Sequence, residues 1–593
     1  MTVGRIVMVW LALAAVGCGV IYQRARIDAI PGPPKLARAW VLSALNAARK
    51  GAPVPKPPEG AADYRGADGV IVDLFHRGVL IRTERAGASL VDGVMEIVRR
   101  LRSDPRIAQH PGWGAEPEQP IRFAVAVPLG DAPFLDVVPG LDLLGLVPLR
   151  EGVSASVDGR TAHLSPHAVW ALAVLDEAVV TPIPDLSFGA DVDRLRQALA
   201  RKLGVPAAQL RGKLRRFVAE TLTGPAYPAD EQPSPEALRA AARQGAAFLL
   251  RHQRRDGRFT YVYDARADEA RRGRGYSLAR HAGTTFFLAQ AARLLDMPEA
   301  REGARRALRW VRRRALTDCG QAKCVGGGRL IRLGGSALTA LATAEWLRGG
   351  TAEQERKLLE QLTAHIRAVQ RPDGELMHDY DRKRKRPIDR QRMYYSGEAA
   401  LALLRAHRVL GDARDLATVA SLMRHLTGGG WSFFGSRYFY GEEHWTCQAV
   451  AAGAGRLDVA SGLDFCLRWS EFQRRIQYGP TETQWPAWGA YGVGPVLLPR
   501  ITAIASRVEA GVPIYRVALA RGDDVGELRT QLAASVSALM RFRWSPGPIH
   551  LMKNPAAALG GFPMTQASLQ VRNDFVQHAG SAMLAWAEQL SDE

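Results

Sequence analysis

The feature that most constrains the fold is an internal repeat between about residue 234 and residue 593. Short segments of small residues recur there, and each is followed by a run rich in Ala and Leu. Their aligned positions 283, 335, 397, 446 and 580 lie 52, 62, 49 and 134 residues apart. Because the last gap is roughly twice the others, a further unit is expected near residues 488–506. A repeat of this period predicts a series of similar helical units, here six.

More polar, amphipathic segments alternate with these openings, at residues 235–252, 299–315, 353–370, 413–426, 456–475 and 525–543. Helices rich in Ala and Gly can approach one another closely, whereas Arg-rich helices face water. We therefore predict an all-α domain over residues 234–593, in which six helical hairpins close into a ring with the small-residue helices inside. An open helical solenoid would give the same pattern.

This pattern resembles the α/α toroid of the six-hairpin glycosidases and terpenoid-cyclase-like proteins. A shared Gln-x-x-Asp-Gly element, found at residues 253–257 and 370–374, supports the resemblance. Its Asp-Gly forms a turn and its Gln caps the preceding helix. The resemblance implies that all inner helices begin at one end of the ring, around a single pocket. Their exposed N–H groups would favour an anionic or hydroxyl-rich ligand.

Ionisable residues near these helix starts are the candidates for catalysis. A glycosidase needs two carboxyl groups on either side of the scissile bond. A lyase or epimerase would instead use Tyr and His as acid and base. The catalytic candidates are Glu398, Glu442, Glu443, Asp574, Tyr395 and His281.

Aromatic and polar residues in the same loops are the candidates for substrate binding, because aromatic rings stack on sugar faces and charged groups bind hydroxyls. They are Arg280, Tyr261, Tyr263, His378, Asp379, Tyr394, His444, Trp445, Trp485, Arg572 and His578. Of these, His444 and His578 are also acid–base candidates. No cofactor or metal is predicted, since Cys319 and Cys324 lack two further zinc ligands and a local disulfide suits them better. Cys447 and Cys466 are expected to be buried thiols.

Residues 64–230 have a different pattern, with short β-type runs at 70–75, 78–83, 123–127 and 153–157. Helical periodicity appears at residues 90–101, 166–175 and 192–203. This mixture predicts a separate α+β domain. The order of its elements, with a β-hairpin through Asp158-Gly159 leading to Ser165-Pro166, resembles the AMMECR-type domain. That resemblance implies no catalytic residue.

The N-terminus predicts export. Residues 1–30 contain an apolar run from Ile6 to Tyr22, which suits either an uncleaved signal anchor or a lipoprotein signal with Cys18 lipidated. The Pro-rich residues 31–63 are expected to be a linker. Both alternatives place the body of the protein in the bacterial cell envelope, outside the cytoplasm and attached to the membrane.

Composition limits the remaining classes. The chain of 593 residues has 47% apolar and 23% charged residues, which excludes a disordered chain or a polytopic membrane protein. Its formal charge of +20 suits an anionic partner, and no nucleic-acid module is found. We expect an envelope-anchored protein that acts on an acidic or cell-envelope glycan by hydrolysis, elimination or epimerisation. The alternatives are a non-catalytic module that binds glycan, peptide or protein, and terpenoid-type chemistry.

Overall fold

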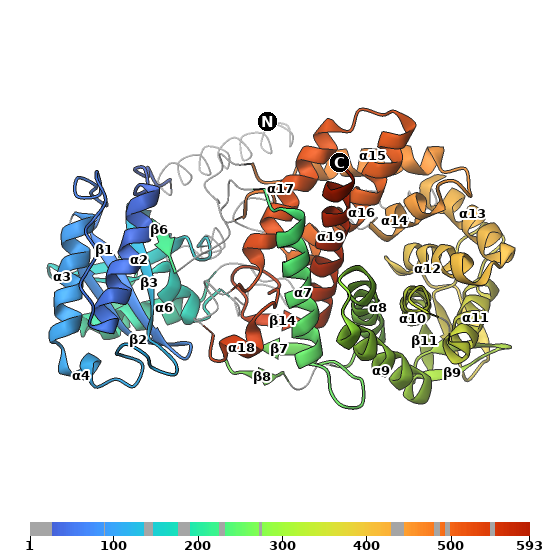
Figure 1. Cartoon of the computed structure of the whole chain (residues 1–593), viewed down its shortest axis with the longest axis horizontal. Coiled ribbons are helices and arrows are strands. Elements are labelled where there is room, and N and C mark those ends of the chain that lie inside the picture. Colours follow the sequence, from blue (N-terminus) through green and yellow to red (C-terminus); the bar gives the residue numbers. More distant parts are fainter. Residues whose placement is uncertain are drawn as a thin grey trace, which may run out of the picture.

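The computed structural model describes residues 26–87, 89–135, 146–175, 190–223, 232–271, 275–350, 352–428, 444–479, 487–492, 499–545 and 552–593. Two parts lie side by side (Figure 1), an α+β domain and a larger helical domain. Among the described residues, no helix is long and apolar enough to cross a membrane. Most of the predicted export segment, including Cys18, lies outside the described residues.

The α+β domain is built on one six-stranded sheet with the order β2-β1-β3-β6-β4-β5, and its neighbouring strands are antiparallel. The strands are β1 (Val70–His76), β2 (Val79–Ala86), β3 (Arg122–Pro133), β4 (Glu151–Val157), β5 (Arg160–Leu164) and β6 (Leu214–Leu222). Asp158 and Gly159 both have positive φ, 51° and 75°, as the two-residue turn of a hairpin requires. β6 was not expected from the sequence, although it lies in the middle of the sheet.

Helices pack on this sheet and on one another. They are α2 (Lys35–Lys50), α3 (Leu90–Ser103), α4 (Pro105–Ala108), α5 (Pro166–Ala171), α6 (Val192–Leu203) and the 3-10 helix η2 (Ala207–Leu210). α2 packs against α3 and buries Trp40, Val41 and Leu45 in the core of the domain. Residues 35–50 are therefore part of this domain, in contrast to the linker expected over residues 31–63. The likeness to the AMMECR-type domain stays a prediction.

The helical domain consists of two concentric sets of helices. The outer set is α7 (Pro235–Arg251), α9 (Pro298–Arg314), α11 (Glu353–Ala368), α13 (Ala413–Gly428), α15 (Ala460–Arg474) and α17 (Gly526–Phe542). The inner set is α8 (Leu278–Leu294), α10 (Leu333–Leu347), α12 (Tyr395–Leu410), α14 (His444–Gly453), α16 (Ile501–Arg521) and α19 (Asn573–Asp592). Each inner helix contacts the next, and α19 contacts both α7 and α8. The ring is therefore closed, which confirms the α/α toroid of six hairpins and excludes the open solenoid.

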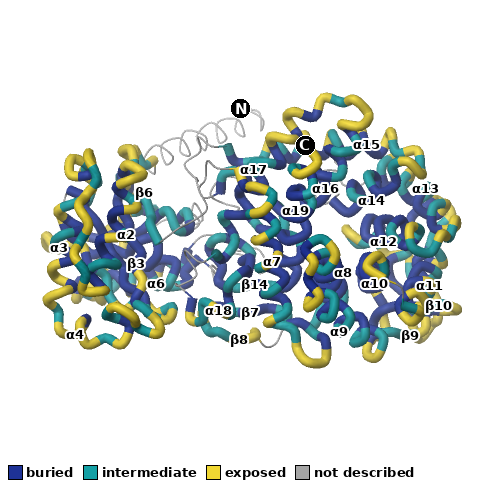
Figure 2. Tube along the Cα trace, in the orientation of Figure 1, coloured by how far each residue is buried: buried dark blue, intermediate teal, exposed yellow. Residues whose placement is uncertain are grey.

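Small residues at the starts of the inner helices explain how closely these helices pack. A Cβ atom on Gly397 of α12 would lie 2.7 Å from the Thr446 backbone nitrogen of α14. A Cβ atom on Gly580 of α19 would lie 2.1 Å from the Phe287 ring of α8. Both glycines belong to the repeated openings, so the repeat reflects close helix contacts. Figure 2 shows the resulting burial along the inner helices.

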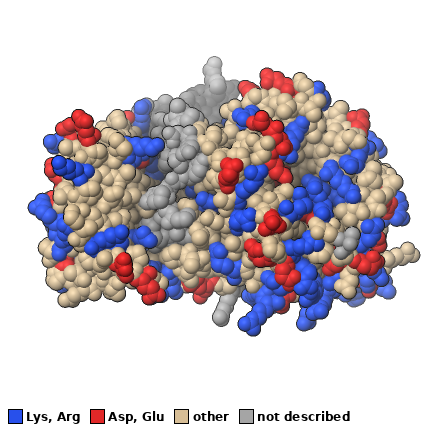
Figure 3. Space-filling view, viewed as in Figure 1, with Lys and Arg blue, Asp and Glu red and all other residues tan. Residues whose placement is uncertain are grey.

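Charged side chains cover the outside of the toroid. α9 ends with Arg312, Arg313 and Arg314, and its buried face is made mainly of alanines. In Figure 3, Lys and Arg gather over the toroid half of the visible face, with Asp and Glu interspersed. The arginines of the outer helices thus lie on the faces exposed to solvent, as the amphipathic pattern predicted.

Two parts of the toroid differ from expectation. The hidden unit expected near residues 488–506, which is the fifth along the chain, has its inner helix α16 later, at Ile501–Arg521. Cys447 and Cys466 form a disulfide between α14 and α15, so the prediction of buried thiols was wrong. Cys319 and Cys324 form the expected local disulfide, between β9 (Leu316–Cys319) and β10 (Ala322–Val325).

Short strands tie together the loops above the inner helices. β14 (Gln570–Arg572) pairs with β7 (Val262–Asp264), which pairs with β8 (Glu269–Ala270). β11 (Leu330–Arg332) pairs with β12 (Asp379–Asp381), which pairs with β13 (Arg386–Ile388). The first of these sheets joins the first and last hairpins, so the ring is closed at its loops as well as its helices.

The two domains are in direct contact. The indole nitrogen of Trp170 in α5 donates to the carbonyl of Gln566 in the last loop of the toroid, at 3.1 Å. Next to that loop is the short helix α18 (Pro555–Ala558). Phe75 and Ala124 of the sheet belong to the same buried cluster as the toroid core. The α+β domain therefore packs against the toroid and is not joined to it by the chain alone.

Candidate functional site

A cavity of about 850 Å³ lies where the six inner helices begin. We call it the N-face cavity. Every inner helix contributes to its wall, as the resemblance to toroid proteins implied. One lining residue from each helix in turn is Arg280, Gly335, Glu398, His444, Ser506 and His578.

Asp574 in the first turn of α19 is the centre of an ion-pair cluster in this wall. It accepts hydrogen bonds from Arg572 Nε at 2.6 Å and Nη2 at 3.0 Å, and Arg280 Nε lies 3.0 Å from its Oδ2. Burial works to raise the pKa of Asp574, but the two arginines outweigh burial and hold it below its usual value. Tyr261 supports Arg280, which donates to its hydroxyl and lies 5.5 Å from its ring centroid. Asp574 is thus a charged group that positions two arginines.

Two histidines from different inner helices of the toroid are in edge-to-face contact. His444 begins α14 and His578 lies in the second turn of α19, with ring centroids 5.8 Å apart and planes at 74°. The Nδ1 atom of His578 lies 2.6 Å from Oε2 of Glu509 in α16. Burial works to lower the pKa of His578, but the Glu509 carboxylate outweighs it and the pKa is raised. Since Nδ1 is engaged by Glu509, Nε2 is the atom of His578 left for acid–base chemistry.

Glu398 in the first turn of α12 is the second carboxyl group of the wall. It is 5% exposed, and among the described residues its Oε2 atom has no hydrogen-bond partner. Burial raises its pKa to about 8, so this group is a neutral acid at pH 7. A buried carboxylic acid with a free oxygen can donate a proton or a hydrogen bond to a ligand in the cavity.

Two groups of described side chains bring potential metal-ligating atoms close together. One ligand atom each of His444, Glu509 and His578 lies within 4.8 Å of the others. Glu509 already accepts the short hydrogen bond from His578, and this pairing fits an acid–base dyad better than two independent ligands. The other group is Cys319, Cys324 and His365, in which both cysteines are joined in the disulfide.

Nine of the candidate residues line the N-face cavity. They are Glu398, Asp574, Tyr395, Arg280, Tyr394, His444, Trp445, Arg572 and His578. Glu442, Glu443 and Trp485 lie outside the described residues.

His281 and Tyr263 are located away from the cavity. His281 is 1% exposed, with Nδ1 2.6 Å from the Tyr276 hydroxyl and Nε2 3.2 Å from the Ala307 carbonyl. Burial lowers its pKa to about 4, so it is neutral. Tyr263 donates to Asp268 at 2.7 Å in the loop above α8. Both side chains are fully engaged in packing the first hairpin.

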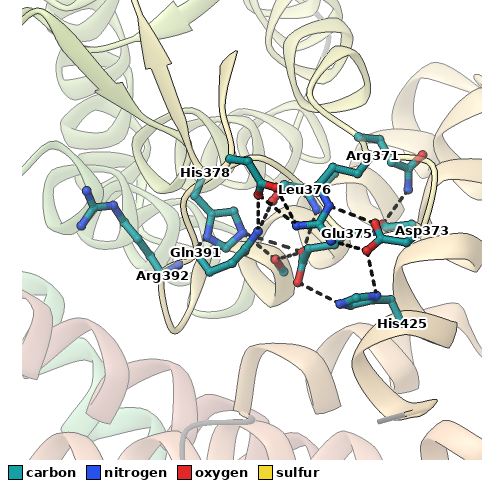
Figure 4. Close-up of polar contacts among 12 residues, drawn as sticks. Arg371, Asp373, Glu375, Leu376, His378, Gln391, Arg392 and His425 are labelled. Carbon is teal, nitrogen blue, oxygen red and sulfur yellow. Dashed lines mark hydrogen bonds and ion pairs between the residues drawn. The ribbon is translucent and has the colours of Figure 1, made fainter. Parts of the chain in front are cut away.

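His378 and Asp379 belong to a polar network in the loop that joins α11 to α12. Figure 4 shows this network around His378, Arg392 and Glu375. The backbone N–H of Arg392 donates to Nδ1 of His378 at 2.7 Å, so Nε2 carries the proton and donates to Ser396 at 2.7 Å. Ser396 donates in turn to Glu375. Asp379 accepts from Arg392 at 2.9 and 3.0 Å. Because Ser396 follows Tyr395 at the start of α12, this network positions Tyr395 and Glu398.

Glu509 is the functional candidate that the sequence analysis missed. It lies in the middle of an otherwise mostly apolar helix, four residues before Pro513. A proline removes the hydrogen bond to the carbonyl four residues earlier, here that of Glu509. A carboxylate at a proline-interrupted position of an inner helix was the available signal. It was overlooked because α16 lacks the small-residue opening of the other units.

No family model and no curated protein matches this chain. Among solved structures, the chain is similar to a D-mannose isomerase, with 12% identity over 60% of this chain and 99% of that chain and a TM-score of 0.47. It is also similar to the cellobiose 2-epimerase of Bacillus thermoamylovorans B4167, with 12% identity and a TM-score of 0.44. This match covers 60% of this chain and 100% of the epimerase chain. An unsaturated glucuronyl hydrolase specific for heparin is 10% identical to this chain, with a TM-score of 0.43. The match covers 59% of this chain and 97% of the hydrolase chain.

These neighbours are carbohydrate-active enzymes, and at such low similarity the chemistry of this chain depends on its own residues. Its closed ring and N-face cavity define an α/α-toroid protein with paired histidines and carboxyl groups where the inner helices begin.

Proposed function

We propose that the N-face cavity is the active site of a sugar epimerase that acts on a carbohydrate with an anionic group. The observation that carries this proposal is the arrangement of His444 beside His578, with Glu509 bonded to His578 at 2.6 Å. Epimerisation next to a carbonyl carbon needs one group that removes a proton and one that returns it. Two imidazoles in one cavity supply both.

In the proposed reaction, one histidine removes the proton from the carbon beside the sugar's carbonyl group. The C–H electron pair forms an enediolate, whose negative charge is stabilised by the imidazolium of the other histidine and by the arginines of the wall. A proton then returns to the same carbon from the other side, and the second imidazole is left neutral. The reaction exchanges protons only, so atoms and electrons balance without an oxidant or a cofactor. Glu509 holds His578 in one tautomer and favours its protonated form.

The charge of the cavity supports an anionic substrate. Four arginines line it, namely Arg280, Arg332, Arg500 and Arg572. They face two carboxyl groups, of which Glu398 is neutral at pH 7 because its pKa is raised to about 8 by burial. The N-terminal ends of the inner helices add to the positive potential. Tyr394 is 36% exposed and offers a ring for stacking against a sugar, whereas Trp445 is 4% exposed and packs against His444 and His578.

Hydrolysis is a weaker proposal for the described residues. A glycosidase needs a second carboxylate that is free to act as base or nucleophile. Asp574 is held at both oxygens by Arg572 and Arg280, and this leaves Glu398 as the freer carboxyl group of the wall. Non-catalytic binding of a glycan remains the alternative class, and the experiment below separates the two.

We also propose that the protein acts in the bacterial cell envelope. The support is the apolar run from Ile6 to Tyr22 with Cys18 inside it. Membrane fractionation of the wild type and of Cys18→Ser tests this. Release of the variant alone indicates lipidation, membrane retention of both indicates a signal anchor, and a soluble cytoplasmic wild type contradicts the proposal.

The activity test is solvent-proton exchange by the whole protein in heavy water. Uronic acids and neutral aldoses are followed by NMR for deuterium at the carbon beside the carbonyl group. We expect exchange with an anionic sugar, and a rate about 10² to 10⁴ lower in His444→Asn and in His578→Asn. His407→Asn is the matched control, because His407 lies in α12 outside the wall of the N-face cavity and its Nδ1 atom lies 2.9 Å from the Asp412 carbonyl. Sugar binding without exchange in the wild type would move the protein to the non-catalytic class, and an unchanged rate in both variants would contradict the mechanism.

A further inference from the structure

A second cavity, of about 460 Å³, lies at the opposite end of the ring, where the inner helices end. We call it the C-face cavity. Its wall comes from α8, α12, α14, α16 and α19 and from the residue that caps α10. Five arginines line it, namely Arg293, Arg348, Arg405, Arg408 and Arg516.

Some of these arginines are compensated and others are not. Glu345, which is 2% exposed, accepts from Arg293 at 2.8 Å and from Arg348 at 3.1 Å. Arg516 donates to Gln589 and lies 3.4 Å from Asp592. Glu345 therefore neutralises part of the charge of the wall, and Asp592 lies beside one further arginine. Two more carboxyl groups, those of Glu509 and Glu588, line the same cavity.

Arg405 and Arg408 form no ion pair with a described carboxylate, although the Glu345 carboxylate acts on both charges at longer range. Arg408 donates to the backbone carbonyl of Ala452 at 3.1 Å and forms no ion pair with a described residue. Arg405 has neither a hydrogen bond nor an ion pair with any residue that the structure describes, and its Nε atom is buried. Burial lowers the pKa of Arg405 to about 10, and the Glu345 carboxylate offsets this effect only in part.

The cavity also has a surplus of hydrogen-bond donors. Nε2 of Gln448 in α14 is buried and has no partner among the described residues. Gln448, Arg405 and Arg408 all line the same cavity. A buried donor without an acceptor costs free energy, so this wall is complete only with an acceptor inside.

Helix polarity explains only part of this arrangement. The C-terminal ends of helices carry partial negative charge and commonly attract arginines that cap free carbonyls. Arg408 fits that role through the Ala452 carbonyl. Arg405 caps no carbonyl of the described residues, and Gln448 lies in the interior of α14, so helix capping accounts for neither.

We propose that the C-face cavity is a binding site for a tetrahedral oxyanion, a phosphate or sulfate group, held by Arg405, Arg408 and Gln448. Guanidinium groups bind such oxyanions through paired N–H donors. The cavity volume leaves room for more than one ion, so the group is either a free ion or part of a small phosphate or sulfate ester. This site lies outside the proposed catalytic cavity and does not depend on its chemistry.

The test is calorimetric titration of the whole protein at constant ionic strength. The probes are inorganic phosphate, inorganic sulfate and glycerol phosphate, with chloride as the reference anion. We expect one phosphate site in the wild type with a dissociation constant below about 1 mM, and at least a tenfold weaker site in Arg405→Gln and in Arg408→Gln. Arg424→Gln, an exposed arginine on the outer helix α13, is the matched control and should bind as the wild type does.

Further outcomes identify the ligand or decide the proposal. Stronger binding of glycerol phosphate than of inorganic phosphate would identify an ester as the ligand, and equal or weaker binding would identify the free ion. Because the N-face cavity also contains arginines, binding that is lost in Arg280→Gln but kept in Arg405→Gln would overturn the proposal. Absence of both phosphate and sulfate binding to the wild type would overturn it too. Retention of phosphate binding in His578→Asn shows that the site does not depend on the proposed epimerase activity.

Discussion

The two ends of the toroid use the same residue type in opposite ways. At the N-face cavity, Arg280 and Arg572 are both bound to Asp574, and Tyr261 supports Arg280. At the C-face cavity, Arg405 has no hydrogen-bond or ion-pair partner among the described residues, and only the more distant Glu345 carboxylate offsets its charge. A compensated arginine is held in a fixed place, where it can orient a ligand, whereas an uncompensated one lowers its free energy by binding an anion. Counting arginines in each wall would not have separated the two roles.

Glu509 connects the two ends. Its carboxylate bonds to His578 of the N-face cavity, and the same residue is part of the wall of the C-face cavity. An anion bound near Glu509 would make ionisation of the Glu509–His578 pair less favourable. The comparison between the two ends can therefore be tested by changing the charge of each wall separately.

The largest effect is expected from Asp574→Asn. This change leaves Arg280 and Arg572 without their carboxylate and makes the N-face wall resemble the C-face wall. Breaking a buried ion pair in this way costs about 3–5 kcal/mol of unfolding free energy. Chemical denaturation with and without phosphate measures the effect. We expect phosphate to recover part of the loss in the variant, and equal stability of variant and wild type would contradict the assigned role of Asp574.

Glu509→Gln is expected to have the next largest effect. Without the Glu509 carboxylate, burial is the largest remaining influence on His578 and lowers its pKa, while Asp574 and Arg572 act in opposite directions. His578 would then lose its proton at a lower pH, so the alkaline limb of the pH–rate profile should shift to lower pH. We expect the exchange rate at pH 7 to fall about tenfold, a barrier increase of about 1.4 kcal/mol. A pH profile that stays in place would show that Glu509 does not control His578.

Glu398→Gln should change the pH dependence of stability. Burial raises the pKa of Glu398 from its ordinary value of 4.5 to about 8, so this group favours the folded state fully below pH 4.5 and progressively less as pH rises to about 8. Between these two values the wild type loses about 1.4 kcal/mol per pH unit relative to a neutral side chain, and above pH 8 the difference levels off. Thermal unfolding should give similar midpoints for the two proteins near pH 4 and a higher midpoint for the variant at pH 8 and above. Parallel curves over the whole range would contradict the buried neutral acid.

The smallest effect is expected from Arg405→Met, and its sign is opposite to that of Asp574→Asn. Removing an uncompensated buried charge should stabilise the protein by about 1 kcal/mol in buffer without phosphate or sulfate. In saturating phosphate the wild type should regain the advantage, because only it binds the anion. Destabilisation of the variant under both conditions would mean that Arg405 has a structural partner.

The ring could be predicted from the sequence because the same short opening recurs along the chain, once for most of the inner helices. Gly397 and Gly580 belong to openings that recur along the chain, and they are needed where neighbouring helices touch. α16 escaped detection in part because Pro513 interrupts its pattern and no such opening precedes it. α2 was expected to be linker because prolines flank it, yet its packing against α3 gives it a buried face.

The site was only partly predictable for a related reason. Nine candidates line the N-face cavity because their distance from a helix start fixes which end of the ring they reach. His281 also lies near a helix start, but its direction around the helix places it against Tyr276 and Ala307. Neither the partnership of Glu509 with His578 nor the lack of a partner for Arg405 is encoded by spacing, since both depend on three-dimensional packing.

The contact between α7 and α19 has a consequence for how the protein is made. These helices open and close the toroid sequence, so the first hairpin cannot complete its packing until the last helix has been synthesised. Structures dominated by such long-range contacts fold late and slowly, and partly made chains expose apolar surface until they close.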